Sequence, residues 1–522
     1  MTKKNIFLIV CIISLLYTFP AYNKYWAPYD EGIITVAAQR VLAGEVPYRD
    51  FFIIMYPPGQ VYAVAFILKF ISYSFTAIRI YAVLVSVGIS LIVYLMSLSL
   101  SGNLLVSLFA WFIALVSSAP RLGAIPAPIW PGVLLGMAAL YAYQKCISGP
   151  GAWRILGVGV LAGLAALFRH DIGIFAIAAI GLTMIAQLFS DRKSFRDVFL
   201  FLGGIFIVIA PCLGYLVFNS AVRDMWASLF LFPFVHMKTA AIGFPAPCWD
   251  LRMIFHGSLH FIKVNQYYTP VIIYVSAGFH FLACIFRERG LSRKNSMLLP
   301  VIVFGALTFN QVRVRTDPAH LLTVIYPALV LFAFMFDRTF SNKTKKRALF
   351  NYTCIGLALF LCILLAVKNM DKYAKNAFIK PYRKDIIKTQ FDAGSVYIPK
   401  EEREDLVKTV RFIKSNADPS EKIYVGNTVH WKDDFGGSLI IYFLADRLPA
   451  VKYYELAPGL VTDPKVHSEI RDSIIRHKVN LIVLQDIDTR GYEEKRNELD
   501  DYIRKHFRQV EKFGKFNLHK RL

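Results

Sequence analysis

Charged residues are scarce in this sequence, where Asp, Glu, Lys and Arg together make up 18% of the 522 residues. Soluble domains are about one-quarter charged. Hydrophobic residues make up 56% of the chain, and they gather in long runs that hold few charges. Because a bilayer core requires about 20 apolar residues of helix, the sequence predicts a polytopic α-helical membrane protein.

Several signatures of nucleotide and metal binding are also missing. The sequence holds no P-loop, no dinucleotide-binding glycine pattern, no HExxH and no CxxC pair. His236, His256 and His260 lie in one long loop without the spacing of metal ligands, so we expect a structural or acceptor-groove role for them. No cofactor is expected, and no residue pattern supports a divalent metal.

The chain carries an excess of positive charge, with a formal net charge of +23. Basic patches that neutralise phosphates are typical of nucleic-acid-binding proteins. Here many basic residues form short clusters between hydrophobic runs, where they orient membrane helices and attract anionic headgroups. We therefore expect membrane lipids as partners, and no nucleic acid.

The positions of these clusters predict the topology. About eleven segments are long and apolar enough to be membrane spans, and counting eleven crossings places every basic cluster on the side of the N-terminus, which the positive-inside rule assigns to the cytoplasm. A further apolar stretch, 57–73, would break this arrangement if it crossed, so we expect it to lie along the outer face or to re-enter. Alternatively, 57–73 crosses and one of the paired spans 78–99 and 103–119 does not, which would leave the number of crossings unchanged. The eleven segments are 5–22, 78–99, 103–119, 129–145, 154–169, 171–190, 197–218, 268–286, 297–312, 319–337 and 349–368.

The pattern changes after the last predicted span. An amphipathic helix is expected over 401–416 and another from Asp463 to about His477, and short apolar strands follow at 422–425 and 481–484. Alternating helices and strands predict a small α/β domain. We divide the chain into a transmembrane domain, 1–368, whose first outer loop spans 23–77, and an extracytoplasmic α/β domain, 369–522. The protein is expected in the cell (inner or plasma) membrane as a multi-pass protein, with its N-terminus in the cytoplasm.

The first outer loop holds two adjacent acids, Asp30 and Glu31, just beyond the first predicted span. A carboxylate at this place can accept the proton of an alcohol that attacks a sugar carbon, which makes both acids candidate catalytic residues. Alternatively, Asp30 only caps a helix over 31–43, where an acid suits the N-terminal dipole. Later in the loop, Arg49 and Asp50 are candidates for binding substrate or a donor phosphate.

A second charged group, Arg169-His170-Asp171, lies between two apolar runs on the expected outer side. A charge at mid-bilayer costs roughly 2.5–3.5 kcal/mol, so such residues usually face partners or a cavity. The three residues are therefore candidates for binding substrate or a donor phosphate. The alternative is a tight outer turn that contains its own Arg–Asp pair.

A third group, Arg313, Arg315, Asp317 and His320, also lies on the expected outer side. The guanidinium fork donates two parallel hydrogen bonds to phosphate oxygens. Simple anchoring at the headgroups is the alternative. Because basic residues on the outer side run against the positive-inside bias, we favour phosphate binding.

These residues carry a resemblance to a known superfamily. The stretch from Tyr29-Asp30-Glu31-Gly32 to Tyr56-Pro57-Pro58-Gly59 resembles the first outer loop of GT-C fold glycosyltransferases, which include protein O-mannosyltransferases, lipid A aminoarabinose transferases and bacterial cell-envelope members. The segments 169–173, 315–320 and 442–449 are also similar to pieces of bacterial members. The resemblance spans most of the chain, although each motif is short.

The resemblance implies transfer of a sugar from a polyprenyl-phosphate donor to an envelope glycan, lipid or protein at the outer membrane face. Asp30 would then activate the acceptor hydroxyl with support from Glu31, and an outer arginine would hold the phosphate leaving group. The chain departs from the superfamily in one respect, because members often carry another acid in the second outer loop and the segment 117–130 has none.

Two other functions remain open. A transporter or flippase would show broken helices and ionisable residues in repeated halves, and the sequence has no such repeat. An envelope polymerase or ligase that joins lipid-linked glycans would share the topology and the lipid, and only the first-loop pattern speaks against it.

The expected topology can be tested by cysteine labelling of intact cells in a cysteine-free background. Cysteines introduced at Ser292 and Ser341 should be protected from a membrane-impermeant thiol reagent because they lie beside cytoplasmic basic clusters. A cysteine at Ser468, in the α/β domain, should be labelled. Labelling at Ser292 with protection at Ser468 would reverse the orientation.

Overall fold

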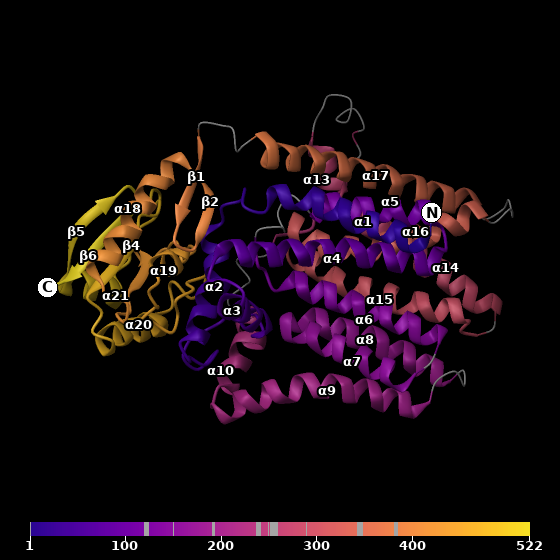
Figure 1. Ribbon diagram of the computed structural model, residues 1–522, viewed down its shortest axis with the longest axis horizontal. Coiled ribbons are helices and arrows are strands. Elements are labelled where there is room, and N and C mark those ends of the chain that lie inside the picture. Colours follow the sequence, from indigo (N-terminus) through magenta and orange to yellow (C-terminus); the bar gives the residue numbers. More distant parts are fainter. Residues whose placement is uncertain are drawn as a thin grey trace.

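Long apolar helices form a bundle whose axes follow the long axis of the molecule, and the C-terminal domain lies beyond one end of this bundle (Figure 1). The computed structural model describes residues 2–118, 125–149, 151–189, 194–235, 242–248, 250, 259–288, 290–341, 348–379 and 385–522. Helices α2 and α3 lie between the bundle and the C-terminal domain, so the first loop joins the two parts (Figure 1).

A helix occupies each of the eleven segments in which the sequence predicts a span. Within the described residues, seven helices are long and apolar enough to cross a membrane, which makes the protein a multi-pass membrane protein. The eleven helices are α1 Lys3–Thr18, α4 Phe75–Ser101, α5 Leu104–Ser118, α6 Ile129–Ser148, α7 Ala152–Phe168, α8 His170–Leu188, α9 Phe195–Phe218, α14 Tyr268–Glu288, α15 Arg293–Val314, α16 Pro318–Ser341 and α17 Ala348–Ala374.

The apolar stretch 57–73 forms a separate short helix, α3 Gly59–Phe70. Its 12 residues span about 18 Å, which is less than the roughly 30 Å of a hydrocarbon core. The helix ends before Ser74, whose hydroxyl accepts a hydrogen bond from the Ala77 N–H (3.2 Å) and caps α4. Helix α3 alone is therefore too short to cross a bilayer.

Glycines let two helices of the bundle approach each other closely. A Cβ atom added to Gly159 on α7 would lie 2.1 Å from the Phe201 carbonyl oxygen on α9, and one added to Gly204 would lie 2.2 Å from the Leu156 carbonyl oxygen. Small residues at such contacts are typical of helix pairs in membranes, where close backbone packing replaces the hydrophobic effect.

Shorter elements connect the bundle with the rest of the chain. They include helix α2 and several turns of helix on the loops that follow α9 and α17. Their bounds are η1 Phe19–Ala21, α2 Pro28–Leu42, α10 Val222–Trp226, the π-helical η2 Ala227–Leu231, α11 Phe232–Val235, α13 Leu259–Asn265 and the π-helical η5 Lys375–Ile379.

The C-terminal domain contains a hairpin, β1–β2, and a four-stranded sheet in the order β3-β4-β6-β5. Strands β3 and β4 are parallel, and the β4–β6 and β6–β5 pairs are antiparallel. The expected strands at 422–425 and 481–484 correspond to β3 and β4, and the expected helices to α18 and α20. The elements are β1 Ile386–Phe391, β2 Gly394–Pro399, α18 Lys400–Asn416, β3 Tyr424–Asn427, α19 Ile440–Ala445, α20 Pro464–Arg476, β4 Leu481–Gln485, α21 Glu498–His506, β5 Phe507–Phe513 and β6 Phe516–Arg521.

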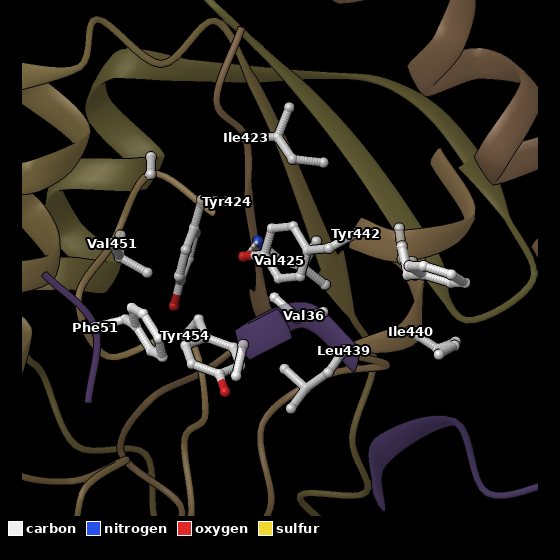
Figure 2. Packing of buried hydrophobic residues seen from close by; sticks show 14 of the residues in the cluster. Val36, Phe51, Ile423, Tyr424, Val425, Leu439, Ile440, Tyr442, Val451 and Tyr454 are labelled. Carbon is white, nitrogen blue, oxygen red and sulfur yellow. Dashed lines mark hydrogen bonds between the residues drawn. The ribbon is translucent and has the colours of Figure 1, made fainter. Parts of the chain in front are cut away.

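One hydrophobic core joins the first outer loop to the C-terminal domain. Val36 on α2 and Phe51 in the same loop pack among buried residues such as Tyr442 and Tyr454 (Figure 2). A Cβ atom added to Gly32 would lie 2.5 Å from the Leu439 Cβ, so α2 lies almost against the backbone before α19. The position of α2 is therefore fixed by residues from both ends of the chain.

A buried ion pair fixes the other side of α2. Arg79 on α4 donates to both carboxylate oxygens of Glu31 at 2.8 Å, and its Nη2 also donates to the Tyr25 carbonyl at 3.0 Å. Both side chains are almost completely buried, with exposed fractions of 1% and 2%. Glu31 therefore ties α2 to the membrane bundle.

We expect Arg79→Met to lower the free energy of unfolding by about 3–5 kcal/mol, because it leaves the Glu31 carboxylate buried without its cation. The double change Glu31→Leu with Arg79→Met removes both charges and should recover most of this loss. Lys408→Met, which breaks an exposed ion pair with Glu404, is the control and should hardly change stability. Denaturant unfolding in detergent would check this, and equal effects of Arg79→Met and Lys408→Met would contradict it.

Candidate active site

A cavity of about 700 Å³ lies where α2, the bundle and the C-terminal domain meet. Asp30, Arg169, Arg315, Asp317 and His320 line it, so five of the predicted site residues from three distant parts of the sequence come together here. Its apolar wall includes Trp26, Ile33, Ile54, Met55 and Trp130. The cavity therefore combines a long apolar surface with several charges of both signs.

Asp30 lies in the first turn of α2. The helix begins at Pro28, and its N-cap position is Ala27, which makes no side-chain capping hydrogen bond. Asp30 is therefore not the cap of a helix over 31–43, although an acid in the first turn still suits the helix dipole. Asp30 also lines a second cavity, which opens along the C-terminal domain.

Asp317 organises the third charged group. Its carboxylate accepts hydrogen bonds from Arg315 Nε (2.9 Å) and from the backbone N–H groups of Ala319 (2.9 Å) and His320 (3.0 Å). His320 Nδ1 also lies 2.9 Å from the Asp317 Oδ1. Burial raises the pKa of the Asp317 carboxyl, but the hydrogen bonds from His320 and Arg315 outweigh burial and hold that pKa well below its usual range. Asp317 is thus an anion that orients Arg315 and His320 at the start of α16.

Arg315 lines both cavities and keeps 37% of its side chain exposed. Among the described residues, only the Nε of its guanidinium group is hydrogen-bonded. The terminal nitrogens can therefore donate to an anion in the cavity.

Arg169 lies on another wall of the first cavity. It donates from Nε (2.9 Å) and Nη2 (3.3 Å) to the two carboxylate oxygens of Asp171, and its guanidinium lies over the Tyr56 ring at 5.3 Å. The internal Arg–Asp pair expected as the alternative for this turn is present, and Arg169 faces the cavity as well. Both features hold for the same side chain.

Six predicted site residues line neither cavity, and four of them are Glu31, His170, Asp171 and Arg313. Glu31 pairs with Arg79. His170 packs its ring against Phe230, and Asp171 faces Arg169 and Gln311. Arg313 is bonded to Asn310 one turn back on α15.

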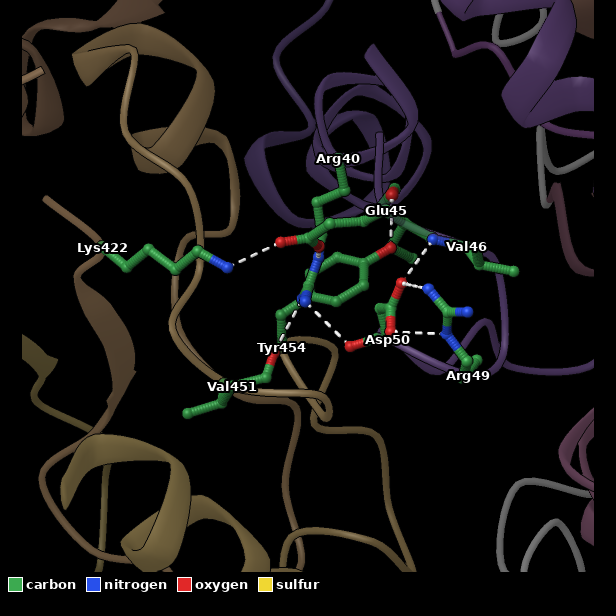
Figure 3. Close-up of polar contacts among 9 residues, drawn as sticks. Arg40, Glu45, Val46, Arg49, Asp50, Lys422, Val451 and Tyr454 are labelled. Carbon is green, nitrogen blue, oxygen red and sulfur yellow. Dashed lines mark hydrogen bonds and ion pairs between the residues drawn. The ribbon is translucent and has the colours of Figure 1, made fainter. Parts of the chain in front are cut away.

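Arg49 and Asp50 also lie outside both cavities, within a polar network at the base of the first loop (Figure 3). Arg49 donates to both carboxylate oxygens of Asp50, and Asp50 accepts from the Val46 N–H at 2.7 Å. Arg40 bridges the Asp50 and Val451 carbonyls. The Arg49–Asp50 pair therefore lies within the first loop, and Arg40 joins this loop to the C-terminal domain.

Two charged residues of the cavity were not anticipated from the sequence. Lys372 comes from the end of α17 and Glu455 from the C-terminal domain. Lys372 follows the last apolar span on the expected outer side, so its position in the sequence could have marked it as a candidate site residue. Glu455 follows Tyr453 and Tyr454, and an acid among aromatic residues that the fold buries is a weaker signal.

The second cavity, of about 630 Å³, shares Tyr29, Asp30, Arg315 and Phe435 with the first. Its remaining wall comes mainly from the C-terminal domain, including Ser438, Gln485 and Asp486. Phe435, a residue that is 48% exposed, packs edge-on against Tyr29 where the two cavities meet. Asp30 is therefore accessible from an apolar side and from a polar side.

No group of three His, Cys, Asp or Glu side chains within the described residues is arranged to hold a metal ion. His236 and His256 lie outside the described residues, and His260 lies on α13. The described charges instead suit an anion with an apolar tail, because three cations lie beside a wall of Trp, Ile and Met side chains.

Comparisons with known proteins give a likeness of structure only. No family model matches the chain, and no curated protein does. The crystal structure of ArnT from Cupriavidus metallidurans bound to undecaprenyl phosphate matches with a TM-score of 0.51 at 11% sequence identity, over 99% of this chain and 96% of that chain. The same protein in the apo state matches with a TM-score of 0.49 at 12% identity, over 98% of this chain and 97% of that chain. The likeness extends over nearly the whole length, so this chain shares the overall fold of that ArnT structure, as the resemblance predicted.

Proposed function

We propose that this protein is a membrane glycosyltransferase that moves a sugar from a polyprenyl-phosphate donor to a cell-envelope glycan, lipid or protein. The observation that carries the proposal is one cavity that holds the Asp30 carboxyl, the cations Arg169, Arg315 and Lys372, and a long apolar wall. The fold of a protein crystallised with undecaprenyl phosphate supports the choice of donor class.

The proposal places the donor lipid along the apolar wall of the first cavity. Its phosphate lies within reach of Arg315 and Arg169, because guanidinium groups bind phosphate oxygens through paired N–H donors. These cations stabilise the negative charge that grows on the phosphate as the bond to the sugar breaks. Each arginine is held in place by its own acid, Asp317 or Asp171.

Asp30 acts on the acceptor in this mechanism. Its carboxylate takes the proton of the acceptor hydroxyl as the hydroxyl oxygen forms a bond to the anomeric carbon of the sugar. The bond from that carbon to the phosphate oxygen breaks, and the polyprenyl phosphate leaves with the electron pair. Because Asp30 also lines the second cavity, the acceptor reaches it from the C-terminal domain.

The same proposal sets the orientation in the membrane. The N-terminus lies in the cytoplasm, eleven helices cross the membrane, and the C-terminal domain lies outside the cell membrane with α2 and α3. The reaction then takes place at the outer face, where the cavity lies between the bundle and the C-terminal domain.

The role of Arg315 can be tested by exchange for lysine. Arg315→Lys keeps the charge but loses the paired donors, so the loss of about 1.5–3 kcal/mol of charged hydrogen bonding should weaken use of the lipid donor roughly ten- to a hundredfold. Arg313→Lys is a matched control, because Arg313 lies two residues away and lines neither cavity. Donor dependence of transfer would be measured for both variants. If both variants depend on donor concentration in the same way, Arg315 does not bind the donor phosphate.

The general-base role of Asp30 has a sharper test. Asp30→Asn preserves the shape of the side chain but cannot take a proton, so transfer should fall by roughly 10²–10⁴-fold with little change in thermal stability. Asp392→Asn, at an exposed position on the β1–β2 hairpin, should leave transfer unchanged. The assay would use purified protein, radiolabelled polyprenyl-phosphate sugars and membrane extract. A folded Asp30→Asn protein with near wild-type turnover would sink the assignment.

A further inference from the structure

The segment that carries Glu455 is fixed on α2 at two points. The Tyr454 hydroxyl donates to the Ile33 carbonyl at 2.7 Å, and the Tyr29 hydroxyl donates to the Leu456 carbonyl at 3.2 Å. Glu455 lies between these two attachments and lines the same cavity as Asp30. The C-terminal domain therefore places a second carboxyl group at the reaction centre.

Glu455 is buried without a cation. Its exposed fraction is 5%, its Oε2 has no hydrogen-bond partner among the described residues, and none of the ion pairs formed within those residues includes it. The titratable and charged groups around it are Asp30 and Tyr29 on α2, Tyr56 before α3, Tyr454 beside it, and Arg169, Arg315, Asp317, His320 and Lys372 on the walls of the cavity.

A buried carboxylate without a paired cation is costly, and a nearby anion adds to the cost, so such a group takes up a proton. Burial raises the pKa of Glu455 to about 8, against the opposing effect of the Ile54 backbone N–H, and the Asp30 charge adds a smaller rise. At neutral pH the group is then a carboxylic acid with an O–H donor. Mechanisms that use a neutral carboxyl as a donor depend on this kind of environment.

We propose that Glu455 binds substrate by donating a hydrogen bond to a hydroxyl group of the transferred sugar or of the acceptor. This inference rests on the proposed function, because it requires a hydroxyl-bearing substrate in the cavity. A polyprenyl chain offers no oxygen to such a donor, and the donor phosphate is bound by Arg315 and Arg169, so Glu455 is left to bind the sugar or acceptor hydroxyls. Asp30 remains the base, and Glu455 stays uncharged beside it.

The proposal predicts a dependence on pH with a defined sign. Below about pH 8 Glu455 is protonated and donates. As the pH rises through that value, Glu455 loses its donor and places a second negative charge beside Asp30, so substrate affinity falls. The alkaline fall in kcat/KM should therefore come from KM.

The experiment compares Glu455→Gln and Glu455→Ala in the full-length protein with the assay described above. Gln retains an N–H donor and cannot ionise, whereas Ala loses the donor. Glu455→Ala should lower kcat/KM about tenfold more than Glu455→Gln, through KM, and Glu455→Gln should lose the alkaline fall. Glu494→Gln, at an exposed acid, is the matched control and should keep the wild-type profile.

An infrared difference spectrum between wild type and Glu455→Gln gives a readout that does not depend on transfer. A carboxylic acid band at neutral pH that disappears above the pKa supports the neutral donor, and its absence overturns the inference. Equal loss of transfer in the Gln and Ala variants also overturns it, because Glu455 would then act by ionising. A wild-type protein that shows the band and transfers no sugar refutes the proposed function, and with it the hydroxyl-bearing substrate that the inference requires.

Discussion

The buried ion pair between Glu31 and Arg79 holds the helix that carries Asp30. On one side this pair binds α2 to the membrane bundle through two hydrogen bonds of 2.8 Å. On the opposite side Gly32 lies almost against the backbone before α19, which belongs to the C-terminal domain. Removing one charge of such a pair leaves the other buried without a partner, so the position of α2 depends on both residues. The direction in which Asp30 faces therefore depends on its neighbours at positions 31 and 32.

This arrangement gives the proposed reaction centre two supports of different chemistry. Arg169 and Arg315 come from the ends of membrane helices, and each is oriented by an acid two residues away. Glu455 comes from the C-terminal domain and is held by hydrogen bonds between backbone carbonyls and tyrosine hydroxyls. The cations are thus fixed relative to the helix bundle, and Glu455 is fixed relative to the C-terminal domain. Asp30 lies between them on α2, which packs on both.

Much of the bundle could be predicted from the sequence, because long apolar runs and basic clusters are direct consequences of the bilayer as a solvent. The short helix α3 was predictable for the same reason. The hairpin β1–β2 and the strands β5 and β6 were missed, since their mixed polar residues resemble loops until a partner strand is known. Among the residues that line the cavity, Asp30, Arg169 and Arg315 could be picked out from the sequence, because charges beside apolar runs are conspicuous. Glu455 was missed, because its burial depends on contacts with residues more than 400 positions away.

The core shared by the first loop and the C-terminal domain has a consequence for biosynthesis. Ile33 and its partner Tyr454 are separated by 421 positions along the chain. At the usual rate of translation, roughly 20–80 s pass between the synthesis of α2 and the synthesis of the residues that cover its apolar face. The membrane helices can insert during this interval, whereas the cavity around Asp30 closes only after the last part of the chain has been made. A chain released early would therefore be an inserted membrane protein that lacks the complete cavity around Asp30 and leaves the apolar face of α2 uncovered.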